Sequence, residues 1–299
     1  MARAPLIAGI EVRKDKVVVM VGEPGEGGSI GILGMGESSY GIIGSNVQSQ
    51  TDGIKEAVDN ASENSQCCIR YLHLVSSDLD VSSEGATSNI DDKGLLQNPP
   101  MPEYLAKIFD DPTLKEDIEI IEVLPKGYCA ALAVTSPEQR KISIIVINAS
   151  ETSLDYAVCQ DDKWMAIGSE SLDGKSYGEA TSLILDKLSH NPEFPILPEV
   201  IVTGLKEVQD AIRKFVQDKT KQPCKAGSPT GFHGAEFASN PDYSALLGIV
   251  RHGMQKQPAF KSSAWGDFKN FIEDIWNDIK LYWRIRQELR KRKDRVVAK

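Results

Sequence analysis

One pattern of predicted elements occurs twice along the chain, and this internal repeat constrains the fold more strongly than any other feature. The first copy is predicted as three strands, a helix and a fourth strand, at residues 6–12, 17–21, 30–35, 47–61 and 69–75. The second copy is predicted at residues 142–147, 154–159, 164–167, 177–188 and 200–202. A repeated module within 299 residues predicts two similar α/β domains that face each other.

The stretch 76–117 differs from the repeat in composition, because it is rich in Ser, Asp, Asn and Gly and poor in aromatic residues. We interpret it as an irregular insertion on the surface. Further elements are predicted as a strand at 118–123, helices at 102–109, 126–134, 206–217 and 243–252, and a loop at 227–240. The predicted division is a first domain 1–135, a second domain 136–255, a linker 256–264 and a C-terminal helix 265–299.

Charge is distributed unevenly between the body and the C-terminal end. The chain carries a net charge of −9, whereas residues 261–299 carry eleven Lys or Arg against six Asp or Glu, which leaves −14 on residues 1–260. An acidic body argues against nucleic acid as the main ligand, since phosphate contacts dominate that affinity. The chain shows no apolar run long enough to span a membrane and no signal-peptide pattern, so we expect a cytoplasmic protein with its five cysteines reduced.

The C-terminal end has the pattern of an amphipathic helix with a basic distal part. Apolar residues recur at alternating steps of three and four, and three of the four tryptophans lie among them. The residues predicted to contact a membrane are Trp265, Phe268, Phe271, Ile272, Ile275, Trp276, Ile279, Trp283, Arg290, Lys291, Arg292 and Lys293. Bulky aromatics and a basic end suit an anionic lipid surface, where each Lys or Arg adds about 1 kcal/mol. The same stripe would also suit a partner helix in a coiled coil, or packing back onto the body.

Patterns typical of catalysis are absent from the sequence. The four histidines are scattered without metal-ligand spacing, and no nucleophile motif is present. Adjacent aspartates occur at 91–92, 110–111 and 161–162, all in predicted turns or loops, where solvated acids are the ordinary explanation.

Four pieces of the chain, in this order and followed by an amphipathic tail, resemble the FtsA family, actin-like proteins that tether the bacterial division ring. These are IAGIEVRKDKVVVMVGE, NVQSQTDGIKEAVDNASE, ISIIVINASETSLDYAV, and EVIVTGLKEVQDA with PDYSALLGIVRHG. The resemblance implies two duplicated actin-like domains of the RNase-H-like type, with ATP held between them. It also implies that the family's insertion subdomains are reduced or lost, because their slots contain only the stretch 76–117 and about ten residues near 190–199.

The sequence departs from the family at each nucleotide-binding turn. The first turn has Arg13-Lys14 where relatives have glycine with Thr or Ser, and backbone approach to a phosphate needs the missing Cβ of glycine. The second turn has lost the acid and every glycine, and of the third only Thr203-Gly204 survives. The predicted vestigial nucleotide-binding residues are Glu11, Arg13, Lys14, Asn148, Ser150, Thr152, Thr203 and Gly204. Only Glu11 keeps a plausible metal-facing carboxylate, so we expect no ATPase activity and no bound cofactor, magnesium-ATP included.

The resemblance therefore leads us to expect a non-catalytic FtsA-like scaffold or adaptor at the inner face of the cell membrane. Its expected partners are anionic lipid and a cell-division or cytoskeletal protein, such as a tubulin-like ring protein, with self-association as a further property. Two alternatives are an ATP-dependent actin-like polymerising switch, in which Arg13 or Lys14 contacts the phosphate, and a pilus-assembly adaptor.

Overall fold

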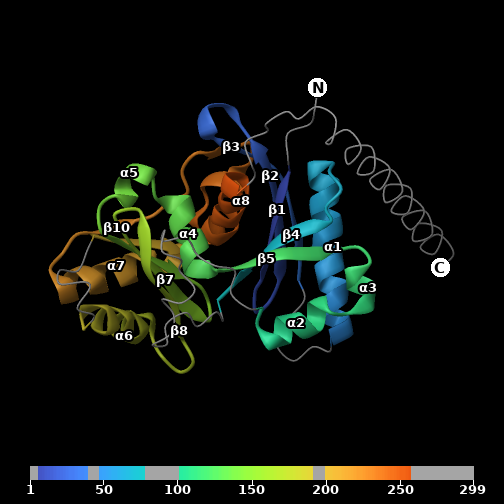
Figure 1. Cartoon of the computed structure of the whole chain (residues 1–299). Helices are drawn as coiled ribbons and strands as arrows, with labels where there is room; N and C mark the ends of the chain where they lie inside the picture. The colour runs from blue at the N-terminus through green and yellow to red at the C-terminus, as the bar shows by residue number, and fades with distance from the viewer. Residues whose placement is uncertain (1–5, 40–46, 78–100, 191–198, 257–299) are drawn as a thin grey trace.

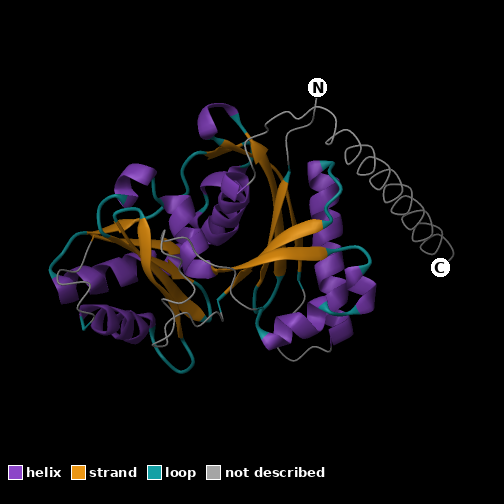
Figure 2. Ribbon diagram, in the orientation of Figure 1, coloured by secondary structure: helices purple, strands orange, loops and turns teal. Residues whose placement is uncertain are grey.

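The computed structural model describes residues 6–39, 47–77, 101–190 and 199–256. It is an α/β structure with two mixed β-sheets (Figures 1 and 2). The predicted C-terminal helix, residues 257–264 of its linker, and residues 78–100 of the irregular stretch lie outside the described residues.

Five strands of the first sheet have the same order and the same directions as the five strands of the second. The first contains β1 (Ile7–Val12), β2 (Val17–Pro24), β3 (Ile30–Ser38), β4 (Tyr71–Ser76) and β5 (Glu119–Pro125) in the order β3-β2-β1-β4-β5. The second contains β6 (Ile144–Ala149), β7 (Ser153–Gln160), β8 (Lys163–Ser171), β9 (Glu199–Gly204) and β10 (Cys224–Ala226) in the order β8-β7-β6-β9-β10. In each sheet the first three strands are antiparallel and the last two pair in parallel. The predicted repeat is confirmed.

Helices separate and cover the two sheets. They are α1 (Val47–Ser65), α2 (Glu103–Phe109), α3 (Pro112–Lys115), α4 (Lys126–Val134), α5 (Pro137–Arg140), α6 (Tyr177–Ser189), α7 (Lys206–Thr220) and α8 (Ser244–Lys256). Figure 1 shows α1 on the outer face of the first sheet, α6 and α7 on the outer side of the second, and α4 and α8 between the sheets. The predicted helices at 102–109 and 126–134 are confirmed by α2 and α4.

The two halves exchange their last helices. Helix α4 follows the first copy of the repeat but packs against β6, β7 and β8, whereas α8 packs against β1, β2 and β4. The two helices cross with their backbones in contact, because a Cβ added at Gly248 would lie 1.6 Å from the carbonyl oxygen of Cys129. One hydrophobic core therefore runs through both halves, and the predicted domain boundaries at 135 and 255 lie next to elements that pack on the opposite sheet.

The segment between α7 and α8 returns to the first sheet. Residues Phe232–His233 form β11, which pairs in parallel with β3, so the prediction of a loop throughout 227–240 is wrong there. A strand of two residues has too few positions to show the alternation by which strands are recognised in a sequence. No helix in the described part of the chain is long and apolar enough to cross a membrane.

Candidate functional site

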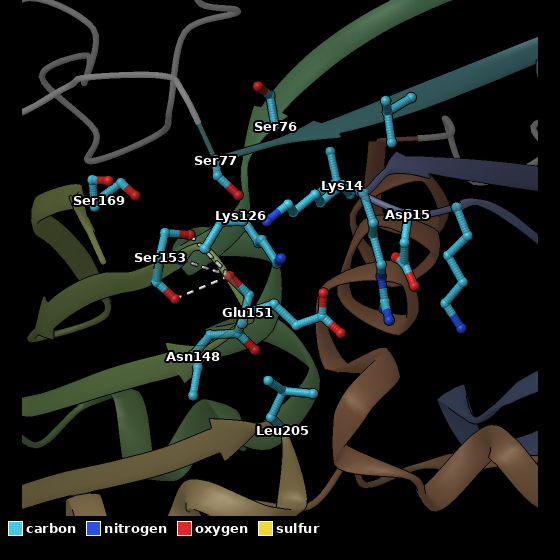
Figure 3. A pocket seen from close by; sticks show the side chains of 18 of the residues that line it. Lys14, Asp15, Ser76, Ser77, Lys126, Asn148, Glu151, Ser153, Ser169 and Leu205 are labelled. Atoms are coloured by element: carbon cyan, nitrogen blue, oxygen red, sulfur yellow. Dashed lines mark hydrogen bonds between the residues drawn. The ribbon is translucent and has the colours of Figure 1, made fainter. Parts of the chain in front are cut away.

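A cavity of about 540 Å³ lies between the two sheets, at the turns that join β1 to β2 and β6 to β7 (Figure 3). This volume is within the range of small-molecule sites. Its lining is rich in serine and threonine, namely Ser76, Ser77, Ser150, Thr152, Ser153, Ser169 and Ser171. Of the eight residues predicted for a vestigial nucleotide site, five line the cavity, namely Arg13, Lys14, Asn148, Ser150 and Thr152.

Among the cations in the turn between β1 and β2, Arg13 is bound to the protein and Lys14 is exposed. The amide of Arg13 donates to the carbonyl oxygen of Lys16 at 2.8 Å, which closes the turn. The Arg13 guanidinium folds back onto the protein, where Nη2 donates at 2.8 Å to Glu11 Oε2 and to the carbonyl oxygen of Asp242. It also lies 5.3 Å from the centre of the Tyr243 ring. Lys14 is exposed, and its side chain extends toward the same region of the cavity as Lys126 (Figure 3).

Glu11 is held between two cations and lies beneath the cavity rather than in its lining. Its side chain is only 2% exposed. Lys126 Nζ lies 2.8 Å from Oε1, and Arg13 Nη2 lies 2.8 Å from Oε2. Burial acts to raise the pKa of Glu11, but Arg13 and Lys126 together outweigh burial and lower this pKa to about 2. The carboxylate predicted to face a metal is therefore ionised and already neutralised by fixed side chains.

The turn between β6 and β7 satisfies its own polar groups. Ser150 and Ser153 exchange backbone and hydroxyl hydrogen bonds of 2.9 to 3.1 Å. The Tyr177 hydroxyl donates to the carbonyl oxygen of Ser150 at 3.0 Å. The turn also places Glu151 in the lining of the cavity, where its negative charge opposes a bound anion.

The surviving glycine of the third turn has a packing role. Gly204 has a φ of +91°, and a Cβ added there would lie 2.1 Å from the carbonyl oxygen of Ala149. The next amide, of Leu205, donates to that oxygen at 2.9 Å. Thr203 is fully buried, and its Oγ1 lies 2.7 Å from the hydroxyl of Ser244. The structure thus places Thr203 and Gly204 at the contact between β6 and β9, outside the cavity lining, where only Leu205 of this turn is found.

Reasoning from the sequence missed two buried charged residues, Lys126 in the cavity lining and Asp155 outside it. Lys126 begins α4, at the carboxyl end of β5, and is 8% exposed. Asp155 lies on β7 with 1% exposure and accepts a hydrogen bond from the Ser153 hydroxyl at 3.0 Å. Burial raises the pKa of Asp155 to about 6, although Lys126 and the hydroxyls of Ser153 and Ser169 counteract this. A polar residue inside the apolar run 154–159 was the available signal for Asp155.

The residues around the cavity do not fit a magnesium-dependent ATP site. Magnesium prefers carboxylate oxygens together with phosphates and water in octahedral geometry. The buried carboxylate of Glu11 on β1, which lies beneath the cavity, already forms ion pairs with Arg13 and Lys126. Within residues 6–39, 47–77, 101–190 and 199–256, no cluster of three His, Cys, Asp or Glu side chains is arranged to hold a metal.

No protein-family model matches the sequence, and no curated protein matches it. Solved structures match the fold. The PilM–PilN type IV pilus biogenesis complex contains a chain that aligns with a TM-score of 0.57 and 12% identity, over 83% of this chain and 98% of that one. The ethanolamine utilization protein EutJ from Carboxydothermus hydrogenoformans aligns with a TM-score of 0.54 and 11% identity, over 83% and 90%. The predicted actin-like fold class is confirmed, whereas the resemblance to FtsA in particular stays a prediction.

Proposed function

We propose that this protein is a non-catalytic adaptor, in which an actin-like body with a degenerate nucleotide site brings a protein partner to the inner face of the cell membrane. The observation that carries the proposal is the position of Glu11 between Arg13 and Lys126. This arrangement fills, with the protein's own cations, the place where a metal would be needed for hydrolysis.

Magnesium would have to displace a cation that already contacts Glu11. Both oxygens of Glu11 contact a cation at 2.8 Å in a buried setting. Breaking one partner away from a buried ion pair typically costs about 3–5 kcal/mol, and a metal would have to displace at least Lys126. The lining also contains Asp15, Glu151, Asp173 and Asp242, but among the described residues no three such side chains are arranged to hold a metal.

The protein would have two kinds of partner, a lipid surface and another protein. The predicted C-terminal helix would attach the acidic body to anionic lipid, with the division or cytoskeletal partner bound by the body. We infer an FtsA-like role from the four matching pieces of sequence. A pilus-assembly adaptor is the alternative within the same class.

One observation favours a second function, an ATP-dependent switch. The exposed Lys14 lines a cavity large enough for a small molecule and forms no ion pair with another described residue. In this alternative Lys14 would contact a phosphate directly, without a metal holding the nucleotide.

Thermal denaturation of the full chain with and without magnesium and ATP tests the proposal. A ligand present at 100 times its Kd stabilises the native state by about 2.7 kcal/mol. For a chain of this size that corresponds to roughly 5–10 °C in Tm, at about 2–4 °C per kcal/mol. We expect no shift beyond that seen with magnesium and sulfate. A shift of several degrees that the variant Lys14→Gln abolishes would instead support the ATP switch.

Sedimentation with vesicles tests membrane attachment. We expect the full chain to sediment with vesicles of phosphatidylglycerol and phosphatidylcholine and to remain soluble with phosphatidylcholine alone. Trp276→Glu places a charge in the predicted apolar stripe and should abolish sedimentation, whereas Asn277→Glu adds the same charge on the predicted polar side. Equal binding by both variants, or binding that ignores anionic lipid, would contradict attachment through this helix.

A further inference from the structure

Helix α8 covers only part of the inner face of the first sheet. Ile249 lies against Gly9 of β1, and Gly253, one turn later, lies against Ile7 and His73. The helix ends at Lys256, whose ammonium group pairs with the carboxylate of Glu122 on β5. Since Ile7 is the first residue of β1, α8 ends where this sheet face still continues toward the beginnings of β4 and β5.

Exposed apolar side chains lie just beyond the end of α8. Tyr71, the first residue of β4, is 52% exposed, and Ile121 of β5 is 51% exposed. Tyr71 is two positions from His73 and therefore lies on the same face of β4 that α8 covers. Its partner across the strands is the exposed Glu119. The pairing skips Ile121, which directly precedes Glu122, the partner of His73. We call these three residues, Tyr71, Glu119 and Ile121, the β4–β5 patch.

The β4–β5 patch lies at an edge of the sheet. Strand β5 is the last strand on its side of the first sheet among the residues that the structure describes. Glu116, which is also exposed, lies three residues before Glu119. Arg70 provides one positive charge, with its guanidinium 5.8 Å from the centre of the Tyr71 ring. The patch thus joins apolar side chains to carboxylates, which suits a partner that is both apolar and basic.

The chain that leaves α8 has this composition. We propose that residues 265–299 of the same chain dock on the β4–β5 patch when no membrane is present, so that lipid and the patch compete for one helix. Residues 261–299 carry a net charge of +5 and an apolar stripe, and residues 1–260 carry −14. Eight residues, 257–264, separate α8 from the stripe and can span up to about 27 Å, whereas β5 is about 23 Å long.

The starting point of this segment is fixed by a buried hydrogen-bond network. Glu122 contacts Lys256 through Oε1, and its Oε2 lies 3.1 Å from His252 Nε2. His252 Nδ1 lies 2.9 Å from the hydroxyl of Tyr128 on α4. Glu122, Tyr128 and His252 are all at least nine-tenths buried. The end of α8 is therefore tied to β5, one residue from Ile121.

A small patch is sufficient because the occupant is tethered. A short linker gives an effective concentration in the millimolar range, so an intrinsic Kd of about 0.1 mM already yields a docked state favoured about 10-fold. Loss of docking should then strengthen vesicle binding by about 10-fold, because the competing state disappears. The vesicle part of this inference rests on the proposed membrane attachment, whereas docking itself does not.

Two measurements on the full chain test the inference. The first is the rate at which trypsin cuts the basic segment 290–293 in the absence of lipid, and the second is sedimentation with phosphatidylglycerol vesicles. The test variants are Tyr71→Glu and Ile121→Glu. The matched control is Leu183→Glu on α6, whose side chain is 46% exposed and far from the patch in the chain. Thermal denaturation checks that each variant is folded.

Docking predicts cleavage about 10-fold faster in both test variants than in wild type or Leu183→Glu, at every protein concentration. It also predicts vesicle binding about 10-fold tighter. Equal cleavage rates in all four proteins would overturn the inference. Protection that grows with protein concentration would overturn it in favour of a second copy on the patch. Faster cleavage without vesicle binding by any variant would uphold docking and reject membrane attachment.

Discussion

Removal of the Lys126 ammonium group should destabilise the protein more than any surface ion-pair deletion. In Lys126→Met, Glu11 would remain 2% exposed and keep only Arg13 as a partner. Breaking a buried pair by removing one partner typically costs about 3–5 kcal/mol. Because Arg13 still neutralises the other oxygen, we expect a loss of about 3 kcal/mol in the free energy of unfolding at pH 7.

Urea denaturation followed by circular dichroism measures this loss. The matched control is Lys175→Met, which removes a partner of Glu170 at a similar distance of 2.7 Å but at a partly exposed site. Exposed pairs contribute about 0.2–1 kcal/mol, so the control should lose no more than that. The double variant Glu11→Gln with Lys126→Met removes the uncompensated charge and should lose less than the sum of the single variants.

The pH dependence supplies a further check. Without Lys126 the pKa of Glu11 should rise from about 2 toward its ordinary value or above it, since burial would be less fully opposed. A depressed folded-state pKa contributes stability that is present above the unfolded pKa and is lost on acidification. Lys126→Met should therefore be destabilised at pH 7, and its difference from the wild type should shrink as pH falls from about 4.5 toward 2. A loss under 1 kcal/mol at pH 7, or additive losses in the double variant, would refute the buried ion-pair argument.

Three other perturbations have expected outcomes. Asp155→Asn should stabilise the protein by up to about 3 kcal/mol at pH 7. The folded-state pKa of Asp155, raised to about 6, contributes stability below pH 4 that is lost as pH rises through 6. Urea titrations should therefore show the variant to be more stable than the wild type at pH 7 but not at pH 4. Gly204→Ala should lower the free energy of unfolding by at least about 2 kcal/mol, since its φ is +91° and a Cβ would meet the carbonyl oxygen of Ala149; an unchanged urea midpoint would contradict this. Burial lowers the pKa of His252 despite its hydrogen bond to Glu122. The free energy of unfolding should therefore fall as pH drops below the unfolded-state pKa of about 6.5. In His252→Gln this free energy should depend less on pH between about 5 and 6.5. Denaturation series in which this variant and wild type have equal slopes would reject that assignment.

Local patterns in the sequence were sufficient to predict the two-sheet fold because the same module of strands and a helix occurs twice in the chain. Alternating and continuous apolar runs predicted the strands from β1 to β9, and the bounds of α4 were predicted to the residue. The three-residue strand β10 was not predicted. The exchange of α4 and α8 is a tertiary arrangement, which the local pattern of neither helix contains. Strand β11 was missed because its pairing with β3 depends on a contact distant in sequence.

The site was harder to predict because its chemistry depends on pairs that are far apart in the chain. The turns around Arg13 and Ser150 were located correctly, since a turn is a local feature. The ion pair between Glu11 and Lys126 joins residues more than 100 positions apart, and a single sequence contains no signal for it. Gly204 resembled a nucleotide-binding residue because the same freedom of φ serves close packing against Ala149.

The crossing of α4 and α8 at Gly248 has a mechanical consequence. A protein held at its C-terminal end transmits any force from a partner through α8. This helix packs on the first sheet, and its backbone contacts α4, which packs on the second. Tension applied at the C-terminal end would act on both halves at once instead of separating them one after the other. Such a connection suits a tether that must keep its shape under force.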